Sequence, residues 1–200
     1  VSLIGIGSEG EILLDSYGIY CDQLILSGHS INFDGNGGNS LKDINSLDWY
    51  YSDYPSQNDG ISIKNSILTS ETLLSLTGQA GSGDFGSNND GIVLFDTELY
   101  SNDLLLNGTG TIGSLIDDSF GVYIYNSLID TLTFGEIIGK GGQDQYEYSL
   151  GSNNHGIYID ESIVDSSNNL TINGTGGSGG EAMDGITFYD SYSTVSNNLN

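Results

Sequence analysis

Acidic side chains stand immediately before a glycine at three places in the sequence, and their chemistry suits a hard cation. The residues are Asp59, Asp90 and Asp184, and asparagines precede the first two. Carboxylate and amide oxygens are the ligands that Ca²⁺ prefers, so a bridging Ca²⁺ would turn the repulsion between stacked aspartates into attraction. Asn and Asp also cap turns without an ion. The two interpretations are therefore a calcium site and a set of structural turns.

Aromatic residues form a second group of candidates, for contact with a sugar ring or a protein surface. Exposed aromatic patches mark binding surfaces, whereas Tyr also covers half-buried strands well. Both interpretations stay open. One set lies in a polar stretch beside the only Pro and comprises Trp49, Tyr50, Tyr51 and Tyr54. The other set alternates with apolar residues and is expected on an outer face: Phe95, Tyr123, Tyr125, Tyr158 and Tyr189.

Two Asn-Gly-Thr triplets, headed by Asn107 and Asn173, are acceptor sequences for N-linked glycans. Each Asn also precedes a glycine that recurs along the chain, and a turn at that place would account for it without any sugar. The triplets therefore predict either glycosylation at both positions or a structural turn.

Catalysis is not predicted from the sequence. Lys and Arg together number three, and the expected outer columns bring together no acid and base of the kind that proton transfer requires. His29 and His155 stand too far from other nitrogen or sulfur ligands in the sequence to suggest zinc. We therefore expect a protein that is not an enzyme and that requires no cofactor, with calcium as the one candidate ion.

The charge balance narrows the classes of partner. The 200-residue chain has a formal net charge of -24, with 27 Asp and Glu against three Lys and Arg. Nucleic-acid binding depends on basic side chains that neutralise phosphates, and anionic membrane surfaces attract the same residues. The sequence contains no apolar run long enough to span a bilayer. We expect neither nucleic-acid binding nor membrane insertion.

A repeat of about thirty residues positions all of these candidates. A Gly followed by an apolar residue opens each repeat, and alternation puts the first and third residues after it on an inner face. Two more short apolar runs follow, and the last of them ends in a Gly-rich stretch. A polar residue five positions after the opening Gly predicts a corner. The opening glycines are Gly18, Gly60, Gly91, Gly121, Gly156 and Gly185.

This pattern predicts an all-β fold, a right-handed parallel β-helix with three short strands in each coil of about 30 residues. The right hand is expected because parallel crossovers are overwhelmingly right-handed. Residues 1–200 are interpreted as one β-helix segment of a longer repeat protein, with long inserted loops at 39–58 and 143–154. Loops on a solenoid often carry recognition, so both are candidates for ligand contact.

The repeats GISIKNSILTSETLLSLTGQAGSG and GIYIDESIVDSSNNLTINGTGGSGG resemble those of filamentous-haemagglutinin-type secreted bacterial proteins. Many of these are exported by two-partner secretion, and their shafts are right-handed parallel β-helices. The resemblance covers nearly the whole chain from about Gly18 onward. It implies an extracellular or cell-surface bacterial protein, either an adhesin or a subunit of a filament or sheath.

The expected partners follow from the same resemblance. They are a carbohydrate, a surface protein, or further copies of the chain in a filament. The alternative function is a polysaccharide-binding or polysaccharide-degrading β-helix that uses the aromatic face and the loops, since some β-helices act on polysaccharides.

Overall fold

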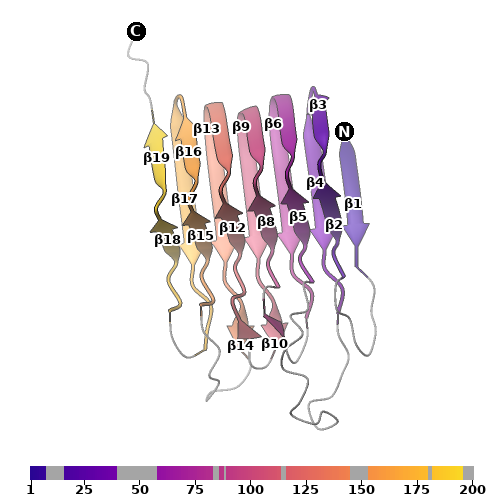
Figure 1. Ribbon diagram of the computed structural model, residues 1–200, viewed down its shortest axis with the longest axis vertical. Helices are drawn as coiled ribbons and strands as arrows, with labels where there is room; N and C mark the ends of the chain where they lie inside the picture. The colour runs from indigo at the N-terminus through magenta and orange to yellow at the C-terminus, as the bar shows by residue number, and fades with distance from the viewer. Residues whose placement is uncertain are drawn as a thin grey trace.

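The computed structural model describes residues 1–7, 16–39, 58–82, 86–87, 89–113, 116–144, 153–179 and 182–195 (Figure 1). All regular elements in these ranges are β-strands. The described part of the chain has no helix that could cross a membrane. The strands are β1 (Ser2–Ile6), β2 (Ile19–Asp22), β3 (Ile25–Gly28), β4 (Ile31–Asn36), β5 (Ile61–Lys64), β6 (Ile67–Gln79), β7 (Gly86–Ser87), β8 (Ile92–Phe95), β9 (Glu98–Thr109), β10 (Ile112–Gly113), β11 (Ile116–Asp117), β12 (Val122–Tyr125), β13 (Leu128–Lys140), β14 (Gln143–Asp144), β15 (Ile157–Asp160), β16 (Ile163–Ser166), β17 (Asn169–Thr175), β18 (Ile186–Tyr189) and β19 (Tyr192–Val195).

The strands form a solenoid in which every pairing is parallel. The first strands of successive coils make a six-stranded sheet in the order β18-β15-β12-β8-β5-β2. The strands of the second and third segments make a nine-stranded sheet along the path β1-β4-β6-β9-β13-β16-β19, with β3 and β17 beside it. The repeat is about 31 residues over about five turns. The predicted parallel β-helix is therefore confirmed.

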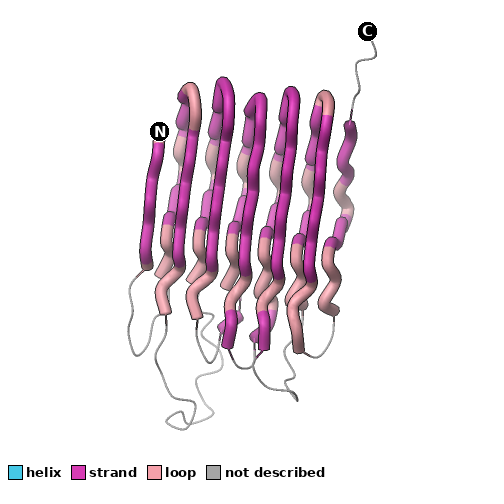
Figure 2. Tube along the Cα trace, turned by 180° about the vertical axis from the view of Figure 1, so that it is seen from behind, coloured by secondary structure: helices cyan, strands magenta, loops and turns pink. Residues whose placement is uncertain are grey.

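Each coil has three strand segments, as predicted, but the second and third are joined in the central coils. There they form one long strand, β6, β9 or β13, with a register irregularity where it bends back. In Figure 1 the first segments run upward in front and the third segments run downward behind them, while the chain advances from right to left. This sense of winding is right-handed. Figure 2 shows the long returning strands from behind.

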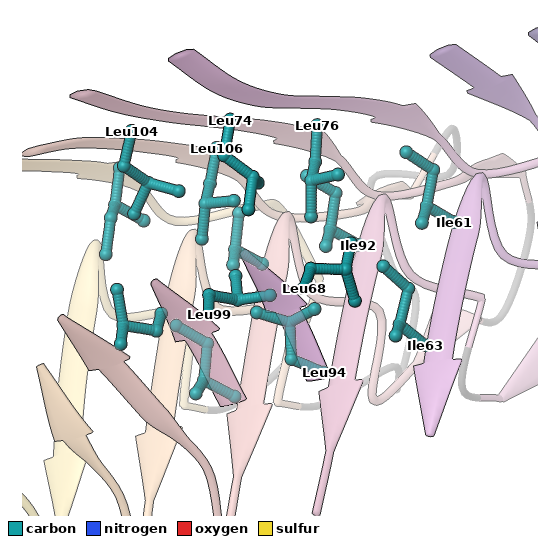
Figure 3. Close-up of a cluster of buried hydrophobic side chains, with 14 of the residues drawn as sticks. Ile61, Ile63, Leu68, Leu74, Leu76, Ile92, Leu94, Leu99, Leu104 and Leu106 are labelled. Carbon is teal, nitrogen blue, oxygen red and sulfur yellow. The ribbon is translucent and has the colours of Figure 1, made fainter. Parts of the chain in front are cut away.

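The core lies between these two walls and consists of aliphatic columns. Ile92 and Leu94 of β8, Leu99 of the first half of β9, and Leu104 and Leu106 of its second half are at most 1% exposed. Equivalent residues of the next coils lie directly beside them, so the columns run along the solenoid axis (Figure 3). Each fully buried aliphatic side chain contributes about 1.5–3 kcal/mol to stability.

Two columns of glycine close the cross-section where the third segment meets the start of the next coil. A Cβ on Gly108 would lie 1.9 Å from the carbonyl oxygen of Gly121, and one on Gly121 would lie 2.2 Å from the nitrogen of Lys140. Only glycine permits so close an approach of two backbones. The sequence interpretation of Gly108 and its equivalents as turn residues is wrong, because they lie inside extended strands. This column contains Gly5, Gly35, Gly78, Gly108, Gly139 and Gly174.

The predicted corner between the first and second segments is confirmed. Its polar residue has a left-handed backbone with φ between 42° and 56°, and the residues are Gln23, Asn65, Asp96, Asn126, Glu161 and Asp190. The Ser or Thr that follows links the coils. For example, the Ser127 hydroxyl donates to Tyr125 O at 2.7 Å and accepts from Thr97 N at 3.0 Å. Ser162 repeats this pattern one coil later.

Candidate functional site

The aspartates before the opening glycines lie in a column whose side chains bond the next coil. The Oδ1 atom of Asp59 accepts a hydrogen bond from Asp90 N at 3.0 Å. The Oδ1 atom of Asp90 in turn accepts one from Phe120 N at 2.6 Å. The parallel pairing of β5, β8 and β12 just after this point holds the three residues one above another. Each carboxylate therefore joins two neighbouring coils.

Asp59 and Asp90 are both 2% exposed, which is unusual for carboxylates. Burial, together with the nearby Asp59 carboxylate, raises the pKa of Asp90 well above its usual range, and the hydrogen bond from Phe120 N opposes this only in part. The fold therefore favours the protonated form of Asp90. The pair stores unfavourable electrostatic energy that one proton would relieve.

A second polar column lies directly beside the aspartates, and its hydrogen bonds run in the opposite direction. Here the side chain of the later coil accepts from the backbone of the earlier coil. Asn89 Oδ1 accepts from Asn58 N at 2.8 Å, and Asn154 Oδ1 accepts from Ser119 N at 3.2 Å. The Ser119 hydroxyl donates to Asn89 O at 2.6 Å. All four residues are buried. The two columns together satisfy backbone groups at the turn, where the sheet hydrogen bonds are interrupted.

The structure brings together only two of the three aspartates that were predicted to bind calcium. Asp59 and Asp90 are adjacent, as stacking required, but the column continues with Phe120 and His155 before it reaches Asp184. The structure therefore separates Asp184 from the other two aspartates. Among the described residues no group of three or more His, Cys, Asp or Glu side chains is arranged to hold a metal ion. A calcium ion at Asp59 and Asp90 stays a prediction.

His155 is a buried member of the same column, 4% exposed. Its Nδ1 atom accepts a hydrogen bond from Asp184 N at 3.2 Å, so the neutral ring carries its proton on Nε2. The Asp184 carboxylate Oδ2 lies 3.8 Å from the same nitrogen. Burial lowers the pKa of His155, and the charges of Asp184 and Asp118 oppose this only in part. The His155 side chain therefore accepts a hydrogen bond from Asp184 N in the next coil, as the Asp59 side chain does from Asp90 N.

We expect His155 to make stability fall at mildly acidic pH. A histidine whose pKa is lowered in the folded state stabilises the fold above its unfolded pKa of about 6.5, and this stability is lost as the pH falls and the unfolded chain takes up a proton. His155→Asn keeps an acceptor for Asp184 N and removes the titration. The measurement is urea unfolding of both proteins from pH 7 to pH 5. The wild type should lose stability relative to the variant, and parallel curves would contradict the prediction.

The outward aromatic residues fall into two neighbouring columns. Tyr123 pairs with Tyr158, and Tyr125 pairs with Phe95. Tyr189 belongs to the second column but is separated from Tyr125 by Asp160. The sequence therefore placed each residue on the correct face of its strand. It did not distinguish the two columns by their burial.

The first column belongs to a packed aromatic cluster formed by Phe120, Tyr123, His155 and Tyr158. The Phe120 ring stacks on His155 at 5.7 Å and on Tyr158 at 5.4 Å, measured between ring centroids. Tyr123 meets Tyr158 edge-on at 5.8 Å. Phe120 is only 8% exposed, and burial raises the pKa of Tyr123 above its usual range.

Two earlier members of the first column are also buried, whereas Tyr20 at its start is 49% exposed. Ser62 and Val93 face outward beside Tyr123 in the sheet, yet they are 0% and 7% exposed. The half-buried interpretation therefore fits the first column. Sequence reasoning missed Phe120 and His155 as members of the cluster. The available signal was their position before an opening Gly, the position that Asp59 and Asp90 occupy in other coils.

The second column presents a smaller and more open aromatic pair. The rings of Phe95 and Tyr125 lie 4.9 Å apart and are tilted by 31°. Both side chains are partly exposed. A hydrogen bond to the Glu161 carboxylate raises the pKa of Tyr125, so the ring has a fixed polar neighbour. Tyr189 is 56% exposed at the end of the same column.

The remaining predicted residues divide into two groups. Trp49, Tyr50, Tyr51 and Tyr54 lie outside the described residues, as do most of the loops 39–58 and 143–154. Asn107 and Asn173 lie in strands β9 and β17, on either side of Ile138 of β13. The turn interpretation of these two residues is wrong. Asn173 is exposed and Asn107 is partly exposed on the outer face, and a glycan at either position stays a prediction.

Comparison with known proteins adds no relative to this picture. No protein-family model, no curated protein and no solved structure matches the chain.

Proposed function

We propose that the protein is a structural and adhesive shaft without catalytic activity, part of a large secreted or surface-anchored bacterial protein of the filamentous-haemagglutinin type. One observation supports this most directly. Four polar side chains at the turn, which are the best candidates for chemistry, accept hydrogen bonds from a neighbouring coil: Asp59, Asn89, Asp90 and Asn154. These side chains therefore hold neighbouring coils of the rod together.

The composition agrees with an extracellular shaft. A net charge of -24 keeps rods apart and soluble, and salt or divalent ions outside cells screen the repulsion along each rod. Stability comes from aliphatic columns and backbone ladders that do not depend on a cofactor. Any recognition falls to the outer faces and loops.

The test of this proposal is an assay for reducing ends after incubation with a panel of plant, fungal and bacterial polysaccharides. We expect no release of sugar by the purified chain over hours at micromolar concentration. A polysaccharide-degrading β-helix of commercial origin serves as the positive control. Turnover of any polysaccharide would overturn the proposal.

Polysaccharide binding is a second candidate, and the open pair of Phe95 and Tyr125 favours it. Two adjacent aromatic rings with a carboxylate at their edge can contact the apolar face of a sugar and accept hydrogen bonds from its hydroxyl groups. On a glycan array, Tyr125→Ala should weaken binding about tenfold, which corresponds to about 1.4 kcal/mol. Tyr100→Ala is the matched control, because the Tyr100 hydroxyl is bonded to Glu98 on the other sheet and the ring has no part in the pair. Equal affinity of both variants and the wild type would exclude the pair as a sugar site.

A further inference from the structure

The aromatic pair of Phe95 and Tyr125 lies in the middle of the rod, on the outer face of the six-stranded sheet (Figure 1). Its strands β8 and β12 are paired on both sides, with β5 before them and β15 after them. The partial exposure of the two rings is therefore a property of interior coils. Sheet pairing puts Lys64 beside Phe95 and Asp160 beside Tyr125. The two flanks of the pair thus carry opposite charges.

The positive flank is directed away from the rings. The Lys64 ammonium lies over the Tyr20 ring of the preceding coil, 5.8 Å from its centroid. The other lysine in the described part of the chain, Lys140, ends strand β13 in the nine-stranded sheet, and the sequence contains no Arg. An anionic ligand at the two rings would therefore meet no cationic side chain of the described residues that is directed toward it.

The negative flank consists of carboxylates near the Tyr125 hydroxyl. Glu161 accepts a hydrogen bond from this hydroxyl, and that bond and the Glu161 charge are the main causes that raise the pKa of Tyr125. The charges of Asp160 and Asp96 add to the same shift. Glu161 is exposed at the corner, so its carboxylate can also accept hydrogen bonds from a ligand that covers the rings.

The Asp160 carboxylate is only partly compensated. One of its oxygens, Oδ1, is buried and accepts no hydrogen bond from the described residues. Burial and the Glu161 charge, with a smaller effect of Asp190, raise the pKa of Asp160, and the hydrogen bond from Glu161 N opposes this only in part. A buried carboxylate oxygen without a partner is unfavourable. A positive charge held beside Glu161 would stabilise both carboxylates by Coulomb attraction.

These observations favour a sugar that carries a positive charge. The C–H face of a sugar ring packs against aromatic rings, and an ammonium group is attracted both to the face of such a ring and to carboxylates. An acidic sugar would instead bring a negative charge close to three carboxylates, and this repulsion would reject it. The net charge of -24 acts in the same direction over a longer range, because it raises the local concentration of cations.

We propose that the pair of Phe95 and Tyr125 binds an amino sugar whose amine is free and protonated, as in a polysaccharide of hexosamine units without acetyl groups. This inference rests on the second function proposed above, polysaccharide binding at this pair, and names the class of sugar. The two rings contact the apolar face of the sugar. The Glu161 carboxylate accepts a hydrogen bond from the amine, and the Asp160 charge adds to the attraction.

Three probes separate the role of the sugar ring from the role of the charge. They are a trimer of glucosamine, the same trimer with every amine acetylated, and a blocked trilysine that has the charge without the sugar. Titration calorimetry at about pH 5.5 keeps the amines protonated and stays above the ordinary Glu pKa of about 4.3. The glucosamine trimer should bind about tenfold more tightly than either other probe. Equal affinity for the acetylated trimer, or for trilysine, would overturn the proposal.

A charge-neutralising variant tests the role of Glu161. Glu161→Gln should weaken binding of the glucosamine trimer about tenfold, and the backbone tolerates Gln, because Gln23 occupies the same corner with a φ of 56°. Glu98→Gln is the matched control: it removes the same charge from a glutamate that accepts from Tyr100 on the other sheet. Equal weakening by the two variants would assign the binding to net charge and overturn the proposal.

Failure of this inference can be distinguished from failure of the functions proposed above. If both trimers bind equally and Tyr125→Ala abolishes both interactions, the pair is a sugar site without selectivity for an amine. If none of the three probes binds, the inference is overturned, and the glycan array still decides whether the pair binds another sugar. Release of reducing ends from any polysaccharide would remove the shaft function whatever binds at the rings.

Discussion

Gly108→Ala is expected to destabilise the protein by about 3 kcal/mol or more, at or above the upper end of what overpacking usually costs. The new methyl carbon would lie 1.9 Å from Gly121 O and 2.7 Å from Gly121 C. Neither backbone can move away easily, since Gly108 is paired on both sides with Gly78 and Gly139. The defect falls in a central coil, at the contact between its third segment and the start of the next coil.

The measurement is urea unfolding followed by far-ultraviolet circular dichroism. Gly28→Ala is the matched control: it makes the same chemical change in a strand, but the nearest atom to its Cβ, Ser30 O, lies at an ordinary 3.6 Å. The control should unfold within about 1 kcal/mol of the wild type, since a strand position with free space tolerates Ala better than Gly. Equal midpoints for the two variants would show that the glycine columns do not hold the walls together.

Asp90→Asn is expected to stabilise the protein at neutral pH. The substitution keeps an oxygen that can accept from Phe120 N and removes a buried charge that faces Asp59. Each pH unit by which the fold raises the pKa of a carboxyl group corresponds to about 1.4 kcal/mol at pH values above both pKa values. The gain should therefore exceed the changes of about 0.5 kcal/mol that surface substitutions usually produce.

The stability gained by Asp90→Asn should depend on pH. A carboxyl group with a raised pKa binds its proton more tightly in the folded chain than in the unfolded one, so its contribution to stability is present at low pH and is lost as the pH rises through the folded pKa. The advantage of Asp90→Asn should therefore grow with rising pH and shrink toward pH 4. Asp130→Asn is the control for net charge, because Asp130 is partly exposed on an outer face. Stabilisation of both variants by the same amount would assign the effect to net charge alone.

Much of the fold could be predicted from the sequence because the repeat brings equivalent residues together. Ile92 and Leu94 were identified as core from alternation alone, and the pairing of β5, β8 and β12 puts them in continuous columns. The corner at Asp96 and Thr97 followed from a polar pair at a fixed offset. Each of these features is local and recurs in every coil, which is why it leaves a sequence signal.

The glycine columns and the aromatic cluster could not be predicted in the same way. A Gly in a turn and a Gly at a close contact between strands look alike in sequence, and only the shape of the cross-section distinguishes them at Gly108. Phe120 and His155 meet because two different coils put unlike residues at one position of the repeat. Such contacts are particular to single coils, so the repeat obscures them. The direction of the Asp90 hydrogen bond likewise depends on the neighbouring coil.

The column that contains Asp90 and Phe120 also sets how the length of this protein can change in evolution. Residues 91–120 span one repeat of the sequence, from one opening glycine to the residue before the next, and their loss would join Asp90 to Gly121 as it is now joined to Gly91. Gain or loss of a gene segment of this size changes the rod by one layer, about 4.8 Å, and leaves the cross-section as it was. The length of the rod can therefore change in steps of one coil, while the packing of its core stays the same.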